Sequence, residues 1–187
     1  MLTVEESLVT SFKILETEMI YHGHAFDVAR VRVSLPDGNQ KTYDLVQHRP
    51  SVTIVPIDDA GAMVFVSQYR IGADKLLLEL PAGNLEPAEE TATGAGRELR
   101  EEIGMAARQL VPIGGTYLSP GYSTEWMTFF MASGLYPAPL PSDPDEFLQV
   151  VAIPVAEAYR RAAAGDIQDG KTLTAMLLAR PHLEAYF

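Results

Sequence analysis

The sequence of 187 residues contains no cysteine. Disulfides and thiolate metal sites are therefore excluded, and a cytoplasmic location is the simpler expectation. The sequence also lacks an apolar run of ~18 residues, the length that a membrane-spanning helix needs. No basic region followed by an apolar stretch occurs near Met1, so we expect no secretory signal.

Basic residues are few. Lysine and arginine number 14 against 25 acidic residues, which gives a formal net charge of −11. This charge repels nucleic-acid backbones and anionic lipid, so we expect no nucleic-acid and no membrane partner. An acidic protein that binds an anionic substrate needs cations at its binding site. The length and the hydrophobic fraction of 47% fit one globular domain.

Alternating and apolar segments predict a chain that begins with strands. Residues 26–33 and 41–47 are expected to pair on either side of a Pro-Asp-Gly turn. Residues 52–57 and 63–66 are expected to form a second, more buried hairpin. Further strands are expected at 76–80 (ended by a loop at 81–83), 110–118 (interrupted at 114–115), 126–131 and 147–153, and helices at 89–103, 155–164 and 171–179. Strands interleaved with helices indicate an α+β fold or a mixed α/β sandwich.

The helix expected at 89–103 has one apolar stripe. Ala92, Ala95, Leu99 and Ile103 recur at spacings of three and four, as the buried side of a helix does. We therefore expect these four side chains to face the core.

Three carboxylates share another face of this helix. Glu98, Glu101 and Glu102 lie three and four residues apart, and Arg97 can reach Glu101 at i+4. Clustered carboxylates repel one another unless they share a cation. Their oxygens suit Mg²⁺ or Mn²⁺, which also bind phosphate oxygens. Taken alone, such a cluster is more often a solvated helix face.

The longer pattern around these residues favours the metal site. Gly83, Glu89 and the run Arg97–Met105 fit Gly-x5-Glu-x7-Arg-Glu-U-x-Glu-Glu-x-Gly-U, with U aliphatic, at every fixed position. The sequence therefore resembles the Nudix hydrolases, which cleave nucleoside diphosphates linked to another group. The resemblance implies an α+β fold, the mixed α/β/α sandwich of that family, and a pyrophosphohydrolase that uses Mg²⁺, with Mn²⁺ as a possible substitute. It also implies that Glu89 holds a loop rather than binds metal.

The resemblance assigns roles to individual residues. Glu98 and Glu102 are implied as the main metal carboxylates, and Glu101 as a third ligand or a partner that activates water. Arg97 is implied to orient Glu101, and the carbonyl of Ala82 to face a metal. In this scheme, metal ions neutralise the diphosphate, orient it and lower the pKa of an attacking water.

Short motifs elsewhere narrow the resemblance to the ADP-ribose pyrophosphatase-like subgroup. They are Gln47–Pro50, Gln68–Arg70, Leu78–Gly83, Ser119–Gly121 and Asp166–Thr172. The subgroup implies hydrolysis of ADP-ribose to AMP and ribose 5-phosphate. Related hydrolases share several of these motifs, so another NDP-sugar such as GDP-mannose is an alternative substrate. A non-catalytic ADP-ribose sensor or dimeric scaffold is a further alternative.

The subgroup also implies substrate contacts. Arg49 and Arg70 are candidates for the diphosphate, because planar guanidinium groups bind phosphate oxygens in pairs. Glu125 is expected to meet a ribose hydroxyl, and Pro120 and Gly121 to lie in the same substrate-binding loop. The plain alternatives are a surface arginine and a solvated loop glutamate. Candidates to stack on adenine, each as compatible with a core or interface position, are Phe26, Tyr43 and Tyr122.

The catalytic base is implied to lie on an acidic loop after the proline-rich residues 137–144. Glu146 is the first candidate, followed by Asp145, and Asp143 also stays open. A mobile loop would fit closure over bound substrate. Glu79 is expected to have a structural role.

Residues 1–48 are extra to a minimal Nudix fold. A lone hairpin is not stable in water, and the resemblance implies that this strand region builds a homodimer in which each site borrows residues from its partner. The alternative is packing against its own core. Residues 49–187 would then form the Nudix hydrolase domain with its C-terminal helix.

Overall fold

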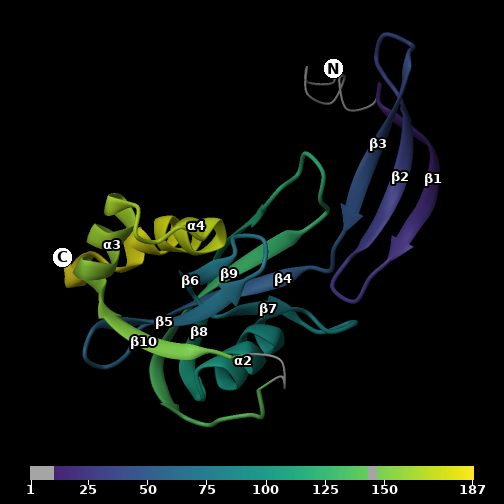
Figure 1. Ribbon diagram of the computed structural model, residues 1–187. Coiled ribbons are helices and arrows are strands. Elements are labelled where there is room, and N and C mark those ends of the chain that lie inside the picture. The colour runs from purple at the N-terminus through teal and green to yellow at the C-terminus, as the bar shows by residue number, and fades with distance from the viewer. Residues whose placement is uncertain (1–10, 143–146) are drawn as a thin grey trace, which may run out of the picture. The chain divides into compact units, whose positions relative to one another are not determined.

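Two units make up the part of the chain that the structure, a computed structural model, describes: residues 11–142 and 147–187 (Figure 1). The first unit comprises residues 11–49 together with Tyr117–Glu125, and the second comprises Pro50–Thr116 with Trp126–Phe187. Among the described residues, no helix combines the length and the apolar character that crossing a membrane requires.

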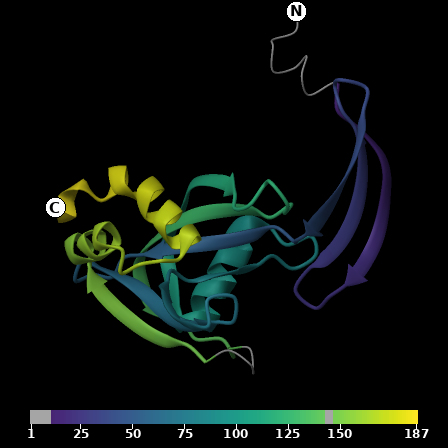
Figure 2. The same ribbon diagram turned by 45° about the horizontal axis from the view of Figure 1, so that its top comes forward.

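An antiparallel sheet of three strands dominates the first unit (Figure 2). Its strands, in spatial order, are β1 (Lys13–His22), β2 (Asp27–Ser34) and β3 (Gln40–Gln47). Asp37 fixes the turn between β2 and β3, since its Oδ1 accepts a hydrogen bond from the N–H of Asn39 at 2.9 Å. The strands predicted at 26–33 and 41–47 are confirmed, each shifted or extended by one residue.

Strand β1 has no counterpart among the predicted strands. All ten of its residues are exposed, so no buried face imposes an alternating pattern on the sequence. Its pairing with β2 is also irregular, with register shifts between Ile14 and Glu16 and between Met19 and Tyr21. Each shift changes which side chains share a face, and this removes the period-two signal that reveals a strand.

Two sheets and their covering helices form the second unit. One sheet has the order β7-β4-β9-β8, and the other has the order β10-β5-β6. The strands are β4 (Ser51–Pro56), β5 (Ala62–Arg70), β6 (Lys75–Glu79), β7 (Ala82–Asn84), β8 (Met105–Tyr117), β9 (Trp126–Pro137) and β10 (Gln149–Pro154). The helices are α2 (Thr91–Glu102), α3 (Val155–Ala164) and α4 (Gly170–Ala179), followed by short 3-10 helices at Arg180–His182 and Glu184–Tyr186.

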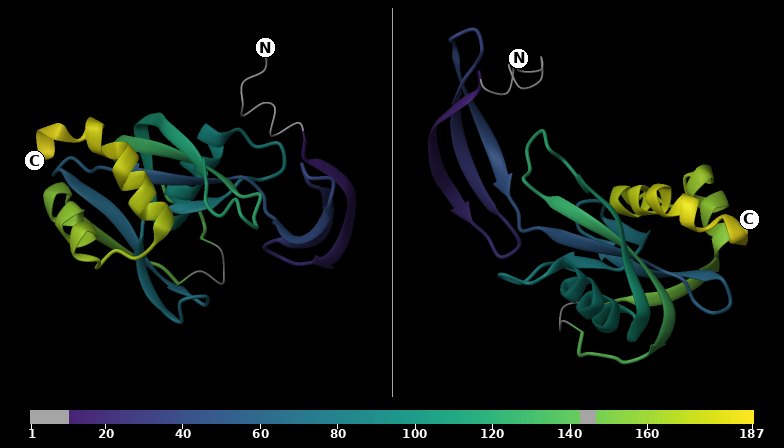
Figure 3. Two further views of the ribbon diagram at one scale, coloured as in Figure 1. Left: turned by 90° about the horizontal axis from the view of Figure 1, so that it is seen from above. Right: turned by 180° about the vertical axis from the view of Figure 1, so that it is seen from behind.

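Helices α2 and α4 lie on opposite sides of β4 (Figures 1 and 3), and all six residues of this strand are buried. On the α2 side, Val52 and Ile54 belong to one hydrophobic core with Leu99 and Phe130. The predicted α+β fold of the α/β/α sandwich type is confirmed. The helices expected at 155–164 and 171–179 are confirmed as α3 and α4, the latter with one more residue at its start.

The second predicted hairpin is wrong. Strand β4 pairs with β7 and, in parallel, with β9, whereas β5 pairs with β6 and β10. A single bridge between Ile57 and Met63 joins the segments that were expected to pair along their length. A strand that is apolar on both faces carries no sequence cue to its pairing partner, because every neighbour offers it the same burial.

Two further boundaries differ from the prediction. Of the loop expected at 81–83, Ala82 and Gly83 belong to strand β7, because their backbone pairs with β4; Pro81 stays outside a strand. Strand β8 runs unbroken through Gly114 and Gly115, where a break was expected. At Gly115 the side chain of Trp126 fills the space that a Cβ would occupy, so this glycine permits close packing and does not end the strand.

Candidate active site

Core packing fixes the orientation of α2. Ala95 and Leu99 are fully buried and Ile103 nearly so, as the apolar stripe predicted, but Ala92 is exposed and the helix begins at Thr91. Gly94 takes the buried position near the helix start, where a Cβ would lie 2.4 Å from Cδ2 of Leu85. With the apolar side held in the core, the carboxylates of the last turn have a defined direction.

Glu98 and Glu102 both face strand β7. Oε2 of Glu102 accepts a hydrogen bond from the N–H of Ala82 at 3.0 Å. The carboxylate of Glu98 lies against Gly83 so closely that a Cβ at that position would be 2.0 Å from Oε1. The two glutamates are only 8% and 7% exposed. The structure therefore brings together two predicted metal carboxylates and the backbone of Ala82.

Arg97 donates hydrogen bonds to three carboxylates. Its Nη1 donates to Oε1 of Glu98 at 2.8 Å and to Oε2 of Glu101 at 2.7 Å, the i+4 contact expected from the sequence. On its other edge, Nε and Nη2 donate to Glu89 at 3.1 and 3.0 Å, and Nη2 also donates to the carbonyl of Asn84 at 2.9 Å. Three carboxylates thus share one guanidinium.

This sharing shifts the pKa values of Glu89 and Arg97. The hydrogen bond from Arg97 is the main cause that lowers the pKa of Glu89 below its ordinary value. The same bond, together with Glu98 and Glu101, raises the pKa of Arg97. The buried Glu102 lies beside this group. Glu89, Glu98, Glu101 and Glu102 therefore outnumber the two arginines of α2, Arg97 and Arg100.

The donor set fits a hard divalent cation. Its members are the carboxylates of Glu98, Glu101 and Glu102, which are oxygen donors of the kind that Mg²⁺ and Mn²⁺ prefer. Ala82 contacts this set through its N–H, which donates to Glu102. In the side-chain arrangement of the described residues, no three His, Asp or Glu side chains already form a group that could hold a metal. Arg97 binds two of the carboxylates, so a cation would compete with this guanidinium for them.

Arg70 is held by a buried carboxylate. Its Nε and Nη2 donate to the two oxygens of Glu79 at 2.8 and 2.7 Å, and Glu79 is 1% exposed. This bond is the main cause that raises the pKa of Arg70, and the charges of Asp169 and Glu102 raise it further. Lys171 also donates to Glu79. The structural role expected of Glu79 agrees with these contacts.

Sequence reasoning singled out the segment that contains Lys171 but gave this residue no role. The available signal was the motif Asp166–Thr172, which lies far along the chain from Glu79. Only the fold brings the two residues together: Lys171 lies at the start of α4, and Glu79 lies at the end of β6, in the sheet β10-β5-β6.

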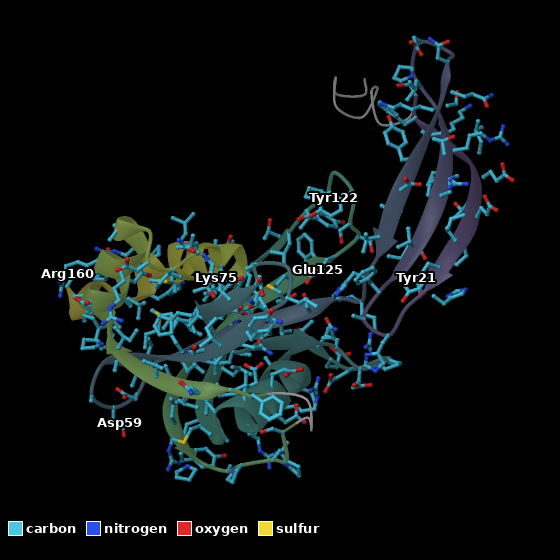
Figure 4. All side chains as sticks on the ribbon, viewed as in Figure 1. Tyr21, Asp59, Lys75, Tyr122, Glu125 and Arg160 are labelled. Atoms are coloured by element: carbon cyan, nitrogen blue, oxygen red, sulfur yellow. The ribbon has the colours of Figure 1, made fainter. Side chains whose placement is uncertain are left out.

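The other predicted substrate contacts lie in the first unit. Pro120 and Gly121 form a turn in which the N–H of Ser123 donates to the carbonyl of Ser119 at 2.8 Å. Glu125, labelled with Tyr122 in Figure 4, lies 3.9 Å from Nδ1 of His48. Arg49 is the last residue of the first of the two segments that form this unit, and it follows His48 in the chain. Arg49 and Glu125 thus belong to the first unit, whereas Arg70 belongs to the second unit, as does the cluster on α2.

The predicted catalytic base lies outside the described residues. Glu146, Asp145 and Asp143 all fall between Ser142 and Phe147, where the description of the structure has its gap.

Comparison with known proteins identifies the class of this chain. The NUDIX domain family matches residues 47–176, and the chain belongs to this family. An ADP-ribose pyrophosphatase of Bacillus subtilis (strain 168) is 32% identical over 166 residues, which cover 88% of this chain and 90% of that protein. An ADP-ribose pyrophosphatase of Mycobacterium tuberculosis (strain ATCC 25618 / H37Rv) is 34% identical over 169 residues, covering 89% and 82%.

A solved structure described as an ADP compounds hydrolase has the same fold. It superposes with a TM-score of 0.84 at 28% sequence identity, covering 93% of this chain and 95% of that chain. The resemblance to the Nudix family and to its ADP-ribose pyrophosphatase-like subgroup is confirmed, and the chain is a Nudix pyrophosphohydrolase.

Proposed function

We propose that the chain hydrolyses the diphosphate bond of ADP-ribose with Mg²⁺, or with Mn²⁺ in its place, and yields AMP and ribose 5-phosphate. The observation that carries the proposal is the convergence of Glu98, Glu102 and the backbone of Ala82 in a cluster whose negative charge exceeds its positive charge. A divalent cation would balance this excess and would let an acidic protein bind an anionic diphosphate.

The residues of α2 would have different roles in the reaction. Glu98 and Glu102 would hold the cation with the Ala82 carbonyl, and Glu101 would be a further ligand or would accept a proton from water. Arg97 would orient Glu101 through their hydrogen bond of 2.7 Å. The cation, when bound, neutralises the diphosphate and lowers the pKa of an attacking water. We propose Glu146 as the base that accepts the proton of that water.

Two arginines and one glutamate would bind the substrate. Nε and one N–H of Nη2 of Arg70 already donate to Glu79, so Nη1 and the second N–H of Nη2 are the donors proposed for phosphate oxygens. Arg49 would supply the second phosphate contact. Glu125, in the loop of Pro120 and Gly121, would accept a hydrogen bond from a ribose hydroxyl.

A substrate panel with product identification tests this function. Turnover of ADP-ribose to AMP and ribose 5-phosphate should require Mg²⁺ or Mn²⁺. The variant Glu102→Gln should lose at least about 100-fold in kcat/KM, while its amide oxygen can still accept the hydrogen bond from Ala82. Glu157→Gln, on α3 where the half-buried Glu157 pairs with Arg161, is the matched control. A tenfold preference for GDP-mannose would overturn the ADP-ribose assignment, and tight binding of ADP-ribose without hydrolysis would favour a sensor.

We further propose that residues 1–48 dimerise the chain, that 49–187 form the catalytic domain, and that the enzyme works in the cytoplasm. Support for the dimer comes from apolar side chains that β1 exposes, among them Ile14 and Ile20. Light scattering should give twice the chain mass of 20.5 kDa. Ile14→Glu with Ile20→Glu should give the monomer mass, whereas Ile71→Glu, in the second unit, should not. A monomeric wild-type chain would refute the dimer.

A further inference from the structure

The start of helix α4 is bonded to the strand segment that leads to the proposed metal site. Thr172 is fully buried, and its Oγ1 accepts a hydrogen bond from the N–H of Leu80 at 2.9 Å. Lys171 donates to Glu79 and, at 3.0 Å, to Asp169. Asp169 in turn caps the helix, because its Oδ2 accepts from the N–H of Thr172 at 2.9 Å. Two consecutive residues of the segment are therefore held from α4.

The same segment contacts both halves of the proposed site. Glu79 binds Arg70 through two hydrogen bonds of 2.8 and 2.7 Å. Three residues further on, the N–H of Ala82 donates to Glu102 on α2. The charge of Glu102 contributes to the raised pKa of Arg70, so the two side chains that are bonded to the ends of the segment also interact electrostatically. A shift of this segment would move the phosphate-binding arginine and the metal-binding backbone together.

We propose that Lys171 and Thr172 are positioning residues of the diphosphate site. Lys171 acts through Glu79, which it shares with Arg70, and so sets the direction of the guanidinium. Thr172 acts through Leu80 and fixes the backbone that ends at Ala82. The proposal rests on the proposed function, because it treats Arg70 and Ala82 as ligands of the substrate and of the cation.

The competing account is that these bonds only fasten α4 to the sheet. Among the residues that the structure describes, Arg70 and Lys171 pair with the buried Glu79, and loss of Lys171 would remove one of these two positive charges. A purely structural bond lowers the melting temperature but leaves the properties of the folded site unchanged. A positioning bond also changes cation affinity or KM in protein that remains folded.

Two variants separate these accounts. Thr172→Val keeps the shape of the side chain and removes the acceptor of the Leu80 N–H, and Thr172→Ser restores that acceptor. Thr174→Val is the control on the same helix, since Thr174 is half-buried and its Oγ1 donates to the carbonyl of Gly170 within α4. Lys171→Met removes the charge beside Glu79, and Arg160→Met removes an exposed positive charge from α3 (Figure 4) as its control.

The measurements are Mn²⁺ affinity by electron paramagnetic resonance without substrate, steady-state KM and kcat with ADP-ribose, and melting temperature. Thr172→Val should weaken Mn²⁺ binding roughly tenfold, and Thr172→Ser should recover most of it. Lys171→Met should raise KM by about tenfold, with a smaller change in kcat. The two control variants should match wild type.

Unchanged Mn²⁺ affinity in Thr172→Val and unchanged KM in Lys171→Met, measured below the melting temperature of each variant, would overturn the proposal. Absence of turnover in wild type would instead contradict the proposed function. In that case the Mn²⁺ affinities of Thr172→Val and Thr172→Ser would still decide whether α4 positions the cation site. If Lys171→Met does not fold, the Mn²⁺ affinities of Thr172→Val and Thr172→Ser decide whether the proposal holds.

Discussion

Replacing Gly83 by alanine should disable the site while the fold stays intact. The backbone of Gly83 lies outside the left-handed region, so alanine can adopt it, and the whole effect of the change is spatial. The new Cβ would lie 2.0 Å from Oε1 and 2.4 Å from Oε2 of Glu98, whereas ordinary contacts begin at 3.4 Å. The carboxylate must therefore move by about 1.4 Å.

The side chain of Glu98 can make this movement more easily than the backbone can. Its carboxylate is the end of a flexible chain, whereas β7 is held by its pairing with β4. We therefore expect a loss of stability of about 1 kcal/mol, the lower end of the range of roughly 1–3 kcal/mol for small insertions into a packed region. Activity should fall by about 100-fold or more, because misplacing a reacting or metal-binding group by ~1 Å has that effect.

The assay compares Gly83→Ala with Gly96→Ala in ADP-ribose turnover, Mn²⁺ affinity and urea unfolding. Gly96 lies on α2, and a Cβ there meets no atom within 4 Å. This control should keep its activity and gain about 0.5–1 kcal/mol, since alanine favours a helix more than glycine does. Wild-type activity in Gly83→Ala would show that the position of Glu98 against β7 does not matter for catalysis.

Two further predictions concern stability. Gly94→Ala should destabilise the protein by about 1–3 kcal/mol, because its Cβ would lie 2.4 Å from Cδ2 of the buried Leu85; an unfolding midpoint equal to that of wild type would contradict this packing. The hydrogen bond from Arg97 lowers the pKa of Glu89, so its stabilisation is present above the ordinary pKa of 4.5 and is lost as the pH falls through the lower folded value. Glu89→Gln should therefore be less stable than wild type at pH 7, with a difference that shrinks as acid unfolding is measured below pH 4.5; a difference that does not change with pH would contradict this role.

The local part of the candidate site could be predicted from the sequence. Glu98, Glu101 and Glu102 share a helix with Arg97, so their spacing along one helical face determines which of them can meet. The contact between Arg97 and Glu101 depends only on four residues of separation, and the structure contains it. The apolar stripe was right for Ala95, Leu99 and Ile103 for the same reason.

Contacts between distant segments could not be predicted in this way. The pairing of β4 with β9 and the bond between Lys171 and Glu79 depend on how the sheets and α4 assemble, and no spacing within either segment encodes them. Ala92 was expected in the core because the helical period continues through it. Ala92 lies in the first turn of the helix but is exposed, and Gly94 provides the close approach to Leu85 instead.

The central claim is that carboxylates on α2 capture the divalent cation that makes an acidic protein bind a diphosphate. Mn²⁺ titration followed by electron paramagnetic resonance, with an uncleavable ADP-ribose analogue present, tests it most directly on wild type and on Glu98→Gln with Glu102→Gln. We expect wild type to bind Mn²⁺ and the double variant to bind it at least about 100-fold more weakly. Equal Mn²⁺ affinity in the two proteins, or no binding to wild type, would contradict the claim.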